Sequence, residues 1–212
     1  GEGGFAAFFI GGGTYSVPWA WRDYGTGPIT VAEIDPAVTR LAGTDFWVDT
    51  TTMRVMHEDG RIALNRLADE RFDVVIGDAF TDIAVPQHLI TREFLALVKR
   101  RLSPGGVYLM NLVDRADRRD ALAAMVATMR AVFPSVQVWV ESEDIAAGGR
   151  TTFVLAGADT LDADEGLREP GPLGRMFLRM TGAELDRLIA ARNPPLLTDD
   201  YAPIDRLIAA ID

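Results

Sequence analysis

A run of glycines and a carboxylate stand where two apolar, strand-like segments end. The run Gly11-Gly12-Gly13 follows the segment 5–10, and Glu33 closes the segment 29–34, about 20 residues further on. Glycines let a ligand approach the backbone closely because no Cβ stands in the way. A carboxylate at the tip of the next strand can accept both hydroxyls of a ribose. The spacing predicts a site for an adenosine-containing ligand at the carboxyl edge of a parallel sheet.

Two further acidic residues follow the next apolar segments. Asp59 comes after 53–56, and it could cap a helix that starts at residue 60, accept a hydrogen bond from an adenine amino group, or do both. Asp78 comes at the carboxyl end of 72–77, the edge where ligands bind in doubly wound sheets. A carboxylate at that edge can bind a cationic amine and take its proton.

The neighbouring residues refine the predicted ligand. Asp35 stands directly before Pro36, which is favoured in the first helical turn, so we expect Asp35 to cap a helix and Glu33 to be the ribose ligand. A pyrophosphate fingerprint would place a further glycine where the chain has Ser16. A ligand without phosphates does not need that glycine. The motif therefore favours a nucleoside over a dinucleotide.

The composition narrows the class of protein. The 212 residues include 48% hydrophobic side chains and no cysteine, which excludes disulfides, thiolate nucleophiles and zinc–cysteine sites. The net charge of −10 argues against a nucleic-acid partner and is compatible with a cationic substrate. We interpret His57 and His88, which lack clustered acids, as loop residues and expect no metal site. No apolar run approaches the ~20 residues of a membrane span. We expect a cytoplasmic protein, or the soluble part of a longer or membrane-associated one.

Strand-like and helical segments alternate through residue 156. The expected strands are 5–10, 29–34, 53–56, 72–77, 106–112, 136–140 and 151–156. The expected helices are 16–23, 36–43, 60–68, 91–102 and 116–132. This alternation predicts an α/β fold with a parallel sheet covered on both faces. The last two strands have no helix-length segment between them, so they should pair antiparallel. A doubly wound, mostly parallel sheet with a C-terminal antiparallel hairpin is typical of the Rossmann-like class I methyltransferase fold.

The remaining residues differ in character. Residues 159–172 are acidic, carry proline and glycine, and are interpreted as a surface linker. Thr181 and Glu184 form a capping-box pattern that predicts a short helix through Ala191. We expect 1–156 to form a nucleoside-binding domain and 157–212 to form a linker and helical tail packed on it. The apolar helix of the tail could instead serve a homodimer.

Taken together, these motifs resemble the spermidine synthase family of polyamine aminopropyltransferases, and in particular the bacterial spermidine synthase-like domains that are often fused to membrane segments. Each piece alone is unspecific, and the combination carries the resemblance. The pieces are Gly11-Gly12-Gly13, Ala32-Glu33-Ile34-Asp35, Glu58-Asp59-Gly60, Gly77-Asp78-Ala79-Phe80, Val85-Pro86-Gln87-His88-Leu89 and Thr198-Asp199-Asp200-Tyr201-Ala202-Pro203.

The resemblance implies a transferase that moves an aminopropyl group from decarboxylated S-adenosylmethionine to a small cationic amine. Asp78 would be the catalytic base, Glu33 would bind the ribose and Asp59 the adenine. The glycine turn would bind the sulfonium side. The nucleoside-side residues would be Gly11, Gly12, Gly13, Thr14, Glu33, Asp59, Gly60, Asp78 and Ala79, and the amine-side residues would be Asp82, Asp200 and Tyr201.

Two departures from the family pattern leave other functions open. Thr14 stands where the family usually has an aspartate, and Thr81 stands where it has a second one, with Asp82 one position late. Without a negative side chain at position 14, the carboxylate of intact S-adenosylmethionine would not be repelled. The alternatives are an S-adenosylmethionine-dependent methyltransferase and a non-catalytic nucleoside-binding domain.

Overall fold

The structure is a computed structural model, and it describes residues 4–22, 27–80, 85–162, 165–169 and 173–209. The chain divides into two compact units. The first comprises residues 1–80 and 97–109, and the second comprises 81–96 and 110–212. Helix α4 (Arg92–Arg101) and strand β5 (Leu102–Arg115) contribute residues to both units.

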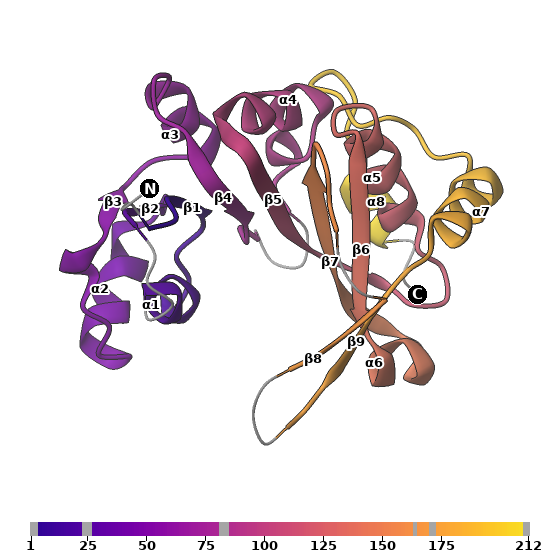
Figure 1. The fold of residues 1–212 in the computed structure, drawn as a ribbon, viewed down its shortest axis with the longest axis horizontal. Coiled ribbons are helices and arrows are strands. Elements are labelled where there is room, and N and C mark those ends of the chain that lie inside the picture. Colours follow the sequence, from indigo (N-terminus) through magenta and orange to yellow (C-terminus); the bar gives the residue numbers. More distant parts are fainter. Residues whose placement is uncertain (1–3, 23–26, 81–84, 163–164, 170–172, 210–212) are drawn as a thin grey trace. The chain divides into compact units, whose positions relative to one another are not determined.

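Parallel strands form the centre of the first unit (Figure 1). They follow the order β3-β2-β1-β4-β5, so the first strand of the chain has two strands on either side. All four residues of β1 are buried, as expected for a short strand in a sheet covered on both faces. The strands other than β5 are β1 (Ala7–Ile10), β2 (Ile29–Ala32), β3 (Arg54–Met56) and β4 (Phe72–Gly77).

Two helices of this unit begin at the acidic residues singled out above. The Asp35 side chain accepts a hydrogen bond from Ala37 N, 2.8 Å away, and starts α2 (Pro36–Asp45). The Asp59 side chain accepts from Arg61 N and Ile62 N and starts α3 (Gly60–Arg66). Both predicted helix caps are confirmed. The unit also contains α1 (Ser16–Arg22) and the 3-10 turn η1 (Thr50–Thr52).

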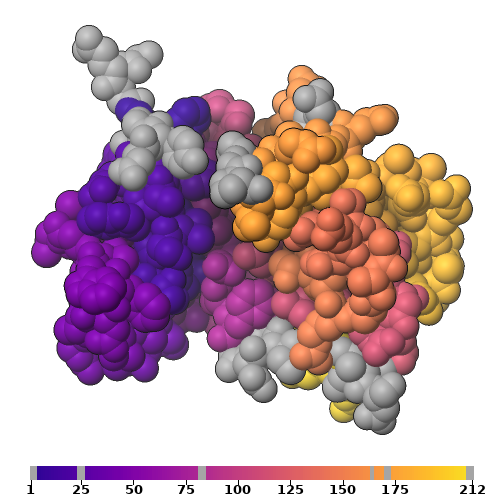
Figure 2. All heavy atoms as spheres, turned by 90° about the horizontal axis from the view of Figure 1, so that it is seen from below, coloured from indigo at the N-terminus to yellow at the C-terminus, as the bar shows by residue number. Residues whose placement is uncertain are grey.

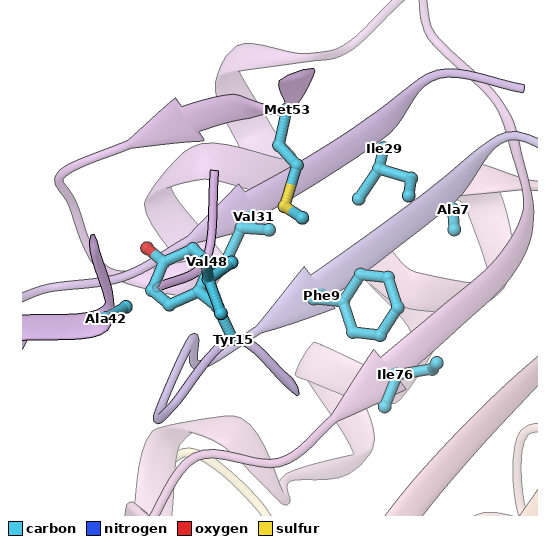
Figure 3. Packing of buried hydrophobic residues seen from close by; sticks show 9 residues of the cluster. All are labelled: Ala7, Phe9, Tyr15, Ile29, Val31, Ala42, Val48, Met53 and Ile76. Carbon is cyan, nitrogen blue, oxygen red and sulfur yellow. The ribbon is translucent and has the colours of Figure 1, made fainter. Parts of the chain in front are cut away.

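Alternate residues of the strands face opposite helices, which follows from the two-residue repeat of a strand. Phe9 of β1 and Val31 of β2 belong to a buried cluster with Ala42 of α2 (Figure 3). On the other face, Phe8 packs its ring 5.1 Å from that of Phe72. Each such buried side chain contributes roughly 1.5–3 kcal/mol relative to an exposed one. In Figure 2 the indigo and purple atoms of this unit pack closely together.

The strands of the second unit follow the order β5-β7-β6-β9-β8, and the pairs β7-β6, β6-β9 and β9-β8 are antiparallel. Val138 of β6 pairs with Leu155 of β7, which confirms the antiparallel C-terminal pair predicted from the short connection. The strands are β6 (Ser135–Glu141), β7 (Arg150–Ala158), β8 (Gly166–Arg168) and β9 (Met176–Arg179). A turn, η2 (Gln87–Leu89), also lies in this unit.

Two segments differ from the expected loops. The connection between β6 and β7 contains a short helix, α6 (Ser142–Ala147), which ends at Gly148 and Gly149 with φ of +72° and +80°. The predicted surface linker 159–172 contains β8, which pairs with β9. Both elements are short, so neither gives enough repeats for a period to be recognised.

The long helix of the second unit begins four residues later than predicted. Helix α5 (Asp120–Arg130) follows Arg119, which has a left-handed φ of +60° and provides no side-chain cap. The buried Asp114 of β5 supplies the missing acceptor, because its carboxylate lies 2.8 Å from Leu122 N. Burial raises the pKa of Asp114.

The tail helices lie against α5. These are α7 (Gly182–Arg192), whose capping box between Thr181 and Glu184 is present as predicted, and α8 (Ile204–Ala209). Arg130 of α5 forms a 2.6 Å ion pair with Asp186 of α7. Within the described part of the chain, none of these helices has the length and apolar character needed to cross a bilayer. The boundary expected at residue 156 stays a prediction.

Candidate functional site

The glycine turn lies against the end of the neighbouring strand β4. Gly11 has a φ of +95°, and a Cβ on it would lie 2.7 Å from the carbonyl oxygen of Asp78 and 3.3 Å from Cα of Ala79. Only a residue without a side chain can approach another backbone so closely. Asp78 N in turn donates to the carbonyl of Ile10, at 2.9 Å. The ends of β1 and β4 therefore bring the glycine turn and Asp78 together.

Glu33 is joined to the same turn from the opposite side of β1. The side chain is buried, with 7% exposed, and its two oxygens accept from Gly12 N at 2.8 Å and Asp35 N at 2.9 Å. We expected this carboxylate to be free, and the structure instead shows it held by two backbone donors. Each carboxylate oxygen can accept a second hydrogen bond, so a ribose hydroxyl can still be accommodated. The two backbone bonds fix the orientation of the carboxylate.

Asp59 lies beyond β3, and its helix begins next to the end of β1. A Cβ on Gly60 would collide with Cγ2 of Ile10, the last residue of β1. The absence of a side chain at Gly60 lets α3 start against this strand, and α3 starts at the Asp59 cap. Asp59 is half-buried, and its Oδ1 serves the cap.

The remaining residues of the turn are more accessible. Gly13 has a φ of +52°, and a Cβ there would meet no atom of the described residues within 4 Å. Thr14 and Ser16 are exposed and share a hydrogen bond of 2.8 Å between their hydroxyls. Asp78 is exposed, and Ala79 is half-buried. The open space therefore lies on the side of the turn where Gly13 and Thr14 stand.

The amine-side roles predicted for Asp82, Asp200 and Tyr201 stay predictions. Asp82 falls outside the residues that the structure describes. Asp200 and Tyr201 belong to the second unit, where both are exposed in a tight turn closed by hydrogen bonds between Thr198 and Tyr201. Next to them, Asp199 accepts a 2.6 Å hydrogen bond from Thr91. Asp199 thus binds the residue that directly precedes α4, within the same unit.

Sequence reasoning missed a polar chain beside the glycine turn. The hydroxyl of Tyr15 lies 2.7 Å from that of Thr39, which lies 3.1 Å from Nε2 of His57. Tyr15 is fully buried although it follows a turn, and its φ is +58°. An aromatic residue two positions after the glycine run was the available signal, but its left-handed backbone cannot be inferred from residue type. In the described segments, no three histidine or acidic side chains gather closely enough to hold a metal ion.

Comparison with known proteins places this geometry in a family. Residues 10–164 match the model of the spermine/spermidine synthase domain. Polyamine aminopropyltransferase of Vibrio vulnificus is 35% identical over 128 residues, which are 58% of this chain and 41% of that protein. N-terminal histidine N-methyltransferase of Emericella nidulans is 27% identical over 83% of this chain and 32% of that protein. The chain thus spans less than half the length of either curated relative.

A solved structure supports the same fold. The probable spermidine synthase of Corynebacterium glutamicum superimposes with a TM-score of 0.75 at 21% identity, over 91% of this chain and 72% of that one. At this identity the likeness establishes the α/β fold, with its mostly parallel sheet and antiparallel C-terminal strands. The family model covers well over half of the sequence and includes the residues from Ile10 to beyond β7. The chain therefore belongs to the spermine/spermidine synthase family.

Proposed function

We propose that this chain transfers an aminopropyl group from decarboxylated S-adenosylmethionine to a small cationic amine. One observation carries the proposal. The glycine turn donates to Glu33 through Gly12 N and contacts the Asp78 backbone through Gly11. A nucleoside-binding carboxylate and a carboxylate suited to act as a base thus flank the same strand end. Membership of the spermine/spermidine synthase family supports aminopropyl transfer as the reaction.

Two carboxylates and an open space beside the glycine turn are suited to hold the nucleoside. Glu33, oriented by two backbone donors, would accept the ribose hydroxyls with its remaining lone pairs. Asp59 would accept from the adenine amino group while its Oδ1 continues to cap α3. The space beside Gly13 would take the sulfonium and the chain attached to it, because an added Cβ there would have no atom of the described segments within 4 Å.

Asp78 would act on the amine. Alkylamines have pKa values near that of lysine, about 10.4, so they are mostly protonated at neutral pH and must lose a proton to become nucleophiles. The Asp78 carboxylate would orient the amine and receive that proton. The nitrogen lone pair then forms a bond to the methylene carbon attached to sulfur. The carbon–sulfur bond breaks, its electron pair neutralises the sulfonium, and methylthioadenosine leaves.

The test is product analysis by mass spectrometry. The chain would be incubated with decarboxylated S-adenosylmethionine and a panel of diamines and polyamines. We expect methylthioadenosine and an aminopropylated amine in equal amounts, and neither product from Asp78→Asn. Asn keeps the shape of the side chain and cannot take a proton, so turnover by this variant at the wild-type rate would remove Asp78 as the base.

Methyl transfer from intact S-adenosylmethionine is the second candidate, and Thr14 favours it. The end of the turn presents the neutral hydroxyls of Thr14 and Ser16, which would not repel the carboxylate of that substrate. A curated relative is named as a methyltransferase.

Calorimetry with both forms of the substrate separates the candidates. If the intact form binds more tightly and Thr14→Asp reverses this preference, the aminopropyl proposal is replaced by methyl transfer. Binding of methylthioadenosine without turnover of either substrate would indicate a nucleoside-binding domain.

A further inference from the structure

Tyr15 combines a costly backbone conformation with a completely buried ring. Its φ of +58° lies in the left-handed region, which costs a bulky L-residue roughly 1–2 kcal/mol. The ring is 0% exposed, and Tyr15 N donates to the carbonyl of Gly12 at 2.7 Å. Surrounding contacts must hold such a conformation in place. Figure 3 shows the ring among Val31, Ala42 and Val48, which belong to the same buried cluster.

The ring of Tyr15 supports the glycine that orients Glu33. A Cβ on Gly12 would lie 2.5 Å from Cζ of the Tyr15 ring and 2.9 Å from its hydroxyl oxygen. Gly12 is therefore a glycine because the tyrosine occupies the space beside it. The N–H of this same Gly12 is the donor to Glu33 Oε2. If the Tyr15 ring moved, Gly12 could move as well, and its N–H would no longer be held in place to donate to Glu33.

The hydroxyl of Tyr15 is anchored to two other elements. It shares a 2.7 Å hydrogen bond with Thr39 of α2, and Thr39 lies 3.1 Å from Nε2 of His57, directly after β3. Burial raises the pKa of the Tyr15 hydroxyl, and the nearby charge of Glu33 raises it further. The hydroxyl therefore stays protonated at neutral pH and remains a partner for Thr39.

We propose that Tyr15, anchored through Thr39 to His57, is a positioning residue that holds Gly12 N and Glu33 in the nucleoside-binding arrangement. This inference rests on the proposed function. Without the hydrogen bond between Tyr15 and Thr39, the left-handed turn relaxes in a fraction of the molecules. The apparent dissociation constant for a nucleoside then rises in inverse proportion to the fraction that keeps the turn. Turnover at saturating substrate is retained, because bound substrate selects the molecules that keep the competent turn.

The experiment compares variants that differ by one hydroxyl. Thr39→Val keeps the β-branched shape and loses the hydroxyl, Thr39→Ser keeps the hydroxyl, and Tyr15→Phe removes the other partner. Thr44→Val is the matched control, because Thr44 lies on the same helix and its hydroxyl donates to the exposed neighbouring Asp45. Calorimetry gives the affinity for methylthioadenosine, and steady-state kinetics with decarboxylated S-adenosylmethionine give kcat and KM.

We expect Thr39→Val and Tyr15→Phe to bind methylthioadenosine about threefold to tenfold more weakly, the loss that corresponds to one hydrogen bond. KM should rise with little change in kcat, and Thr39→Ser and Thr44→Val should behave as the wild type. Wild-type affinity in Thr39→Val, or equal losses in Thr39→Val and Thr39→Ser, would overturn the inference. If Tyr15→Phe does not fold, the Thr39 pair decides alone. A wild-type chain that binds no methylthioadenosine overturns the proposed function as well, which distinguishes the two failures.

Discussion

Replacing Gly11 by alanine tests whether the close approach of the glycine turn to Asp78 matters. A side chain at a φ of +95° costs roughly 1–2 kcal/mol in backbone strain. The new Cβ would also lie 2.7 Å from the carbonyl oxygen of Asp78, and overpacking of this kind costs about 1–3 kcal/mol. Since the atom in the way is backbone, it cannot rotate aside. We expect Gly11→Ala to lose about 2–5 kcal/mol of unfolding free energy in total.

Gly105→Ala is the matched control for this prediction. Gly105 belongs to the same unit and has a φ of +80°, but in the part of the chain that the structure describes no atom lies within 4 Å of a Cβ built on it. It therefore carries the backbone strain and not the collision. Both variants also gain the same small entropic benefit of alanine in the unfolded chain. The difference between them, about 1–3 kcal/mol, isolates the contact with Asp78.

The assay is urea denaturation of the wild type and both variants, together with calorimetry of methylthioadenosine binding. We expect both variants to unfold at a lower urea concentration than the wild type, with a similar dependence of the unfolding free energy on urea. The larger decrease in the midpoint, and a loss of affinity for methylthioadenosine, are expected for Gly11→Ala. Equal shifts in the two variants, with wild-type affinity in both, would refute the reasoning that Gly11 is required by the neighbouring Asp78 backbone.

Three further predictions concern single side chains. Asp59→Asn should keep the stability of the wild type, because asparagine caps helices as well as aspartate, whereas Asp59→Ala should lose about 1 kcal/mol in thermal or urea unfolding; equal stability of the two would contradict the cap. Asp78→Asn should abolish turnover while the affinity for methylthioadenosine, measured by calorimetry, stays within about twofold, because the proposed partner of Asp78 is the amine and the nucleoside keeps its hydrogen bonds. The N–H of Thr181, and then its hydroxyl, hold the pKa of Glu184 below the ordinary value of 4.5, so the capping box stabilises α7 fully above that pH and loses this contribution as the pH falls. Glu184→Gln should keep the box and lack this acid-dependent component in unfolding measured between pH 6 and about 3, and an unchanged pH profile would contradict the assignment.

The sequence contained enough to predict the parallel half of the fold and the arrangement of its acidic residues. Short apolar segments that end in glycine or acid produce strands whose carboxyl ends meet at one edge. Thus Gly11, Glu33 and Asp78 were expected at one strand end, and the structure joins them there. The caps at Asp35 and Asp59 were also predictable, because a cap depends on adjacent residues alone.

What could not be predicted depends on long-range contacts or on unusual backbone. Helix α5 begins late because Asp114, several residues earlier on β5, supplies its acceptor. Strand β8 has three residues and exists because β9 lies beside it. The left-handed φ of Tyr15 is unfavourable by residue type, and the burial of its ring and its hydrogen bond with Thr39 compensate for it. The hydrogen bonds from Tyr15 through Thr39 to His57 could not be predicted either, because they depend on this backbone conformation and join residues far apart in the sequence.

Binding of the ribose of a sulfur-linked nucleoside by Glu33 is the central claim about this site. The most direct measurement is the calorimetric affinity for methylthioadenosine of the wild type and of Glu33→Gln, with Asp78→Asn as the control. Since a hydrogen bond to a charged group contributes about 1.5–3 kcal/mol, Glu33→Gln should bind at least about tenfold more weakly. Asp78→Asn should bind like the wild type. Equal affinity of the wild type and Glu33→Gln would contradict the account.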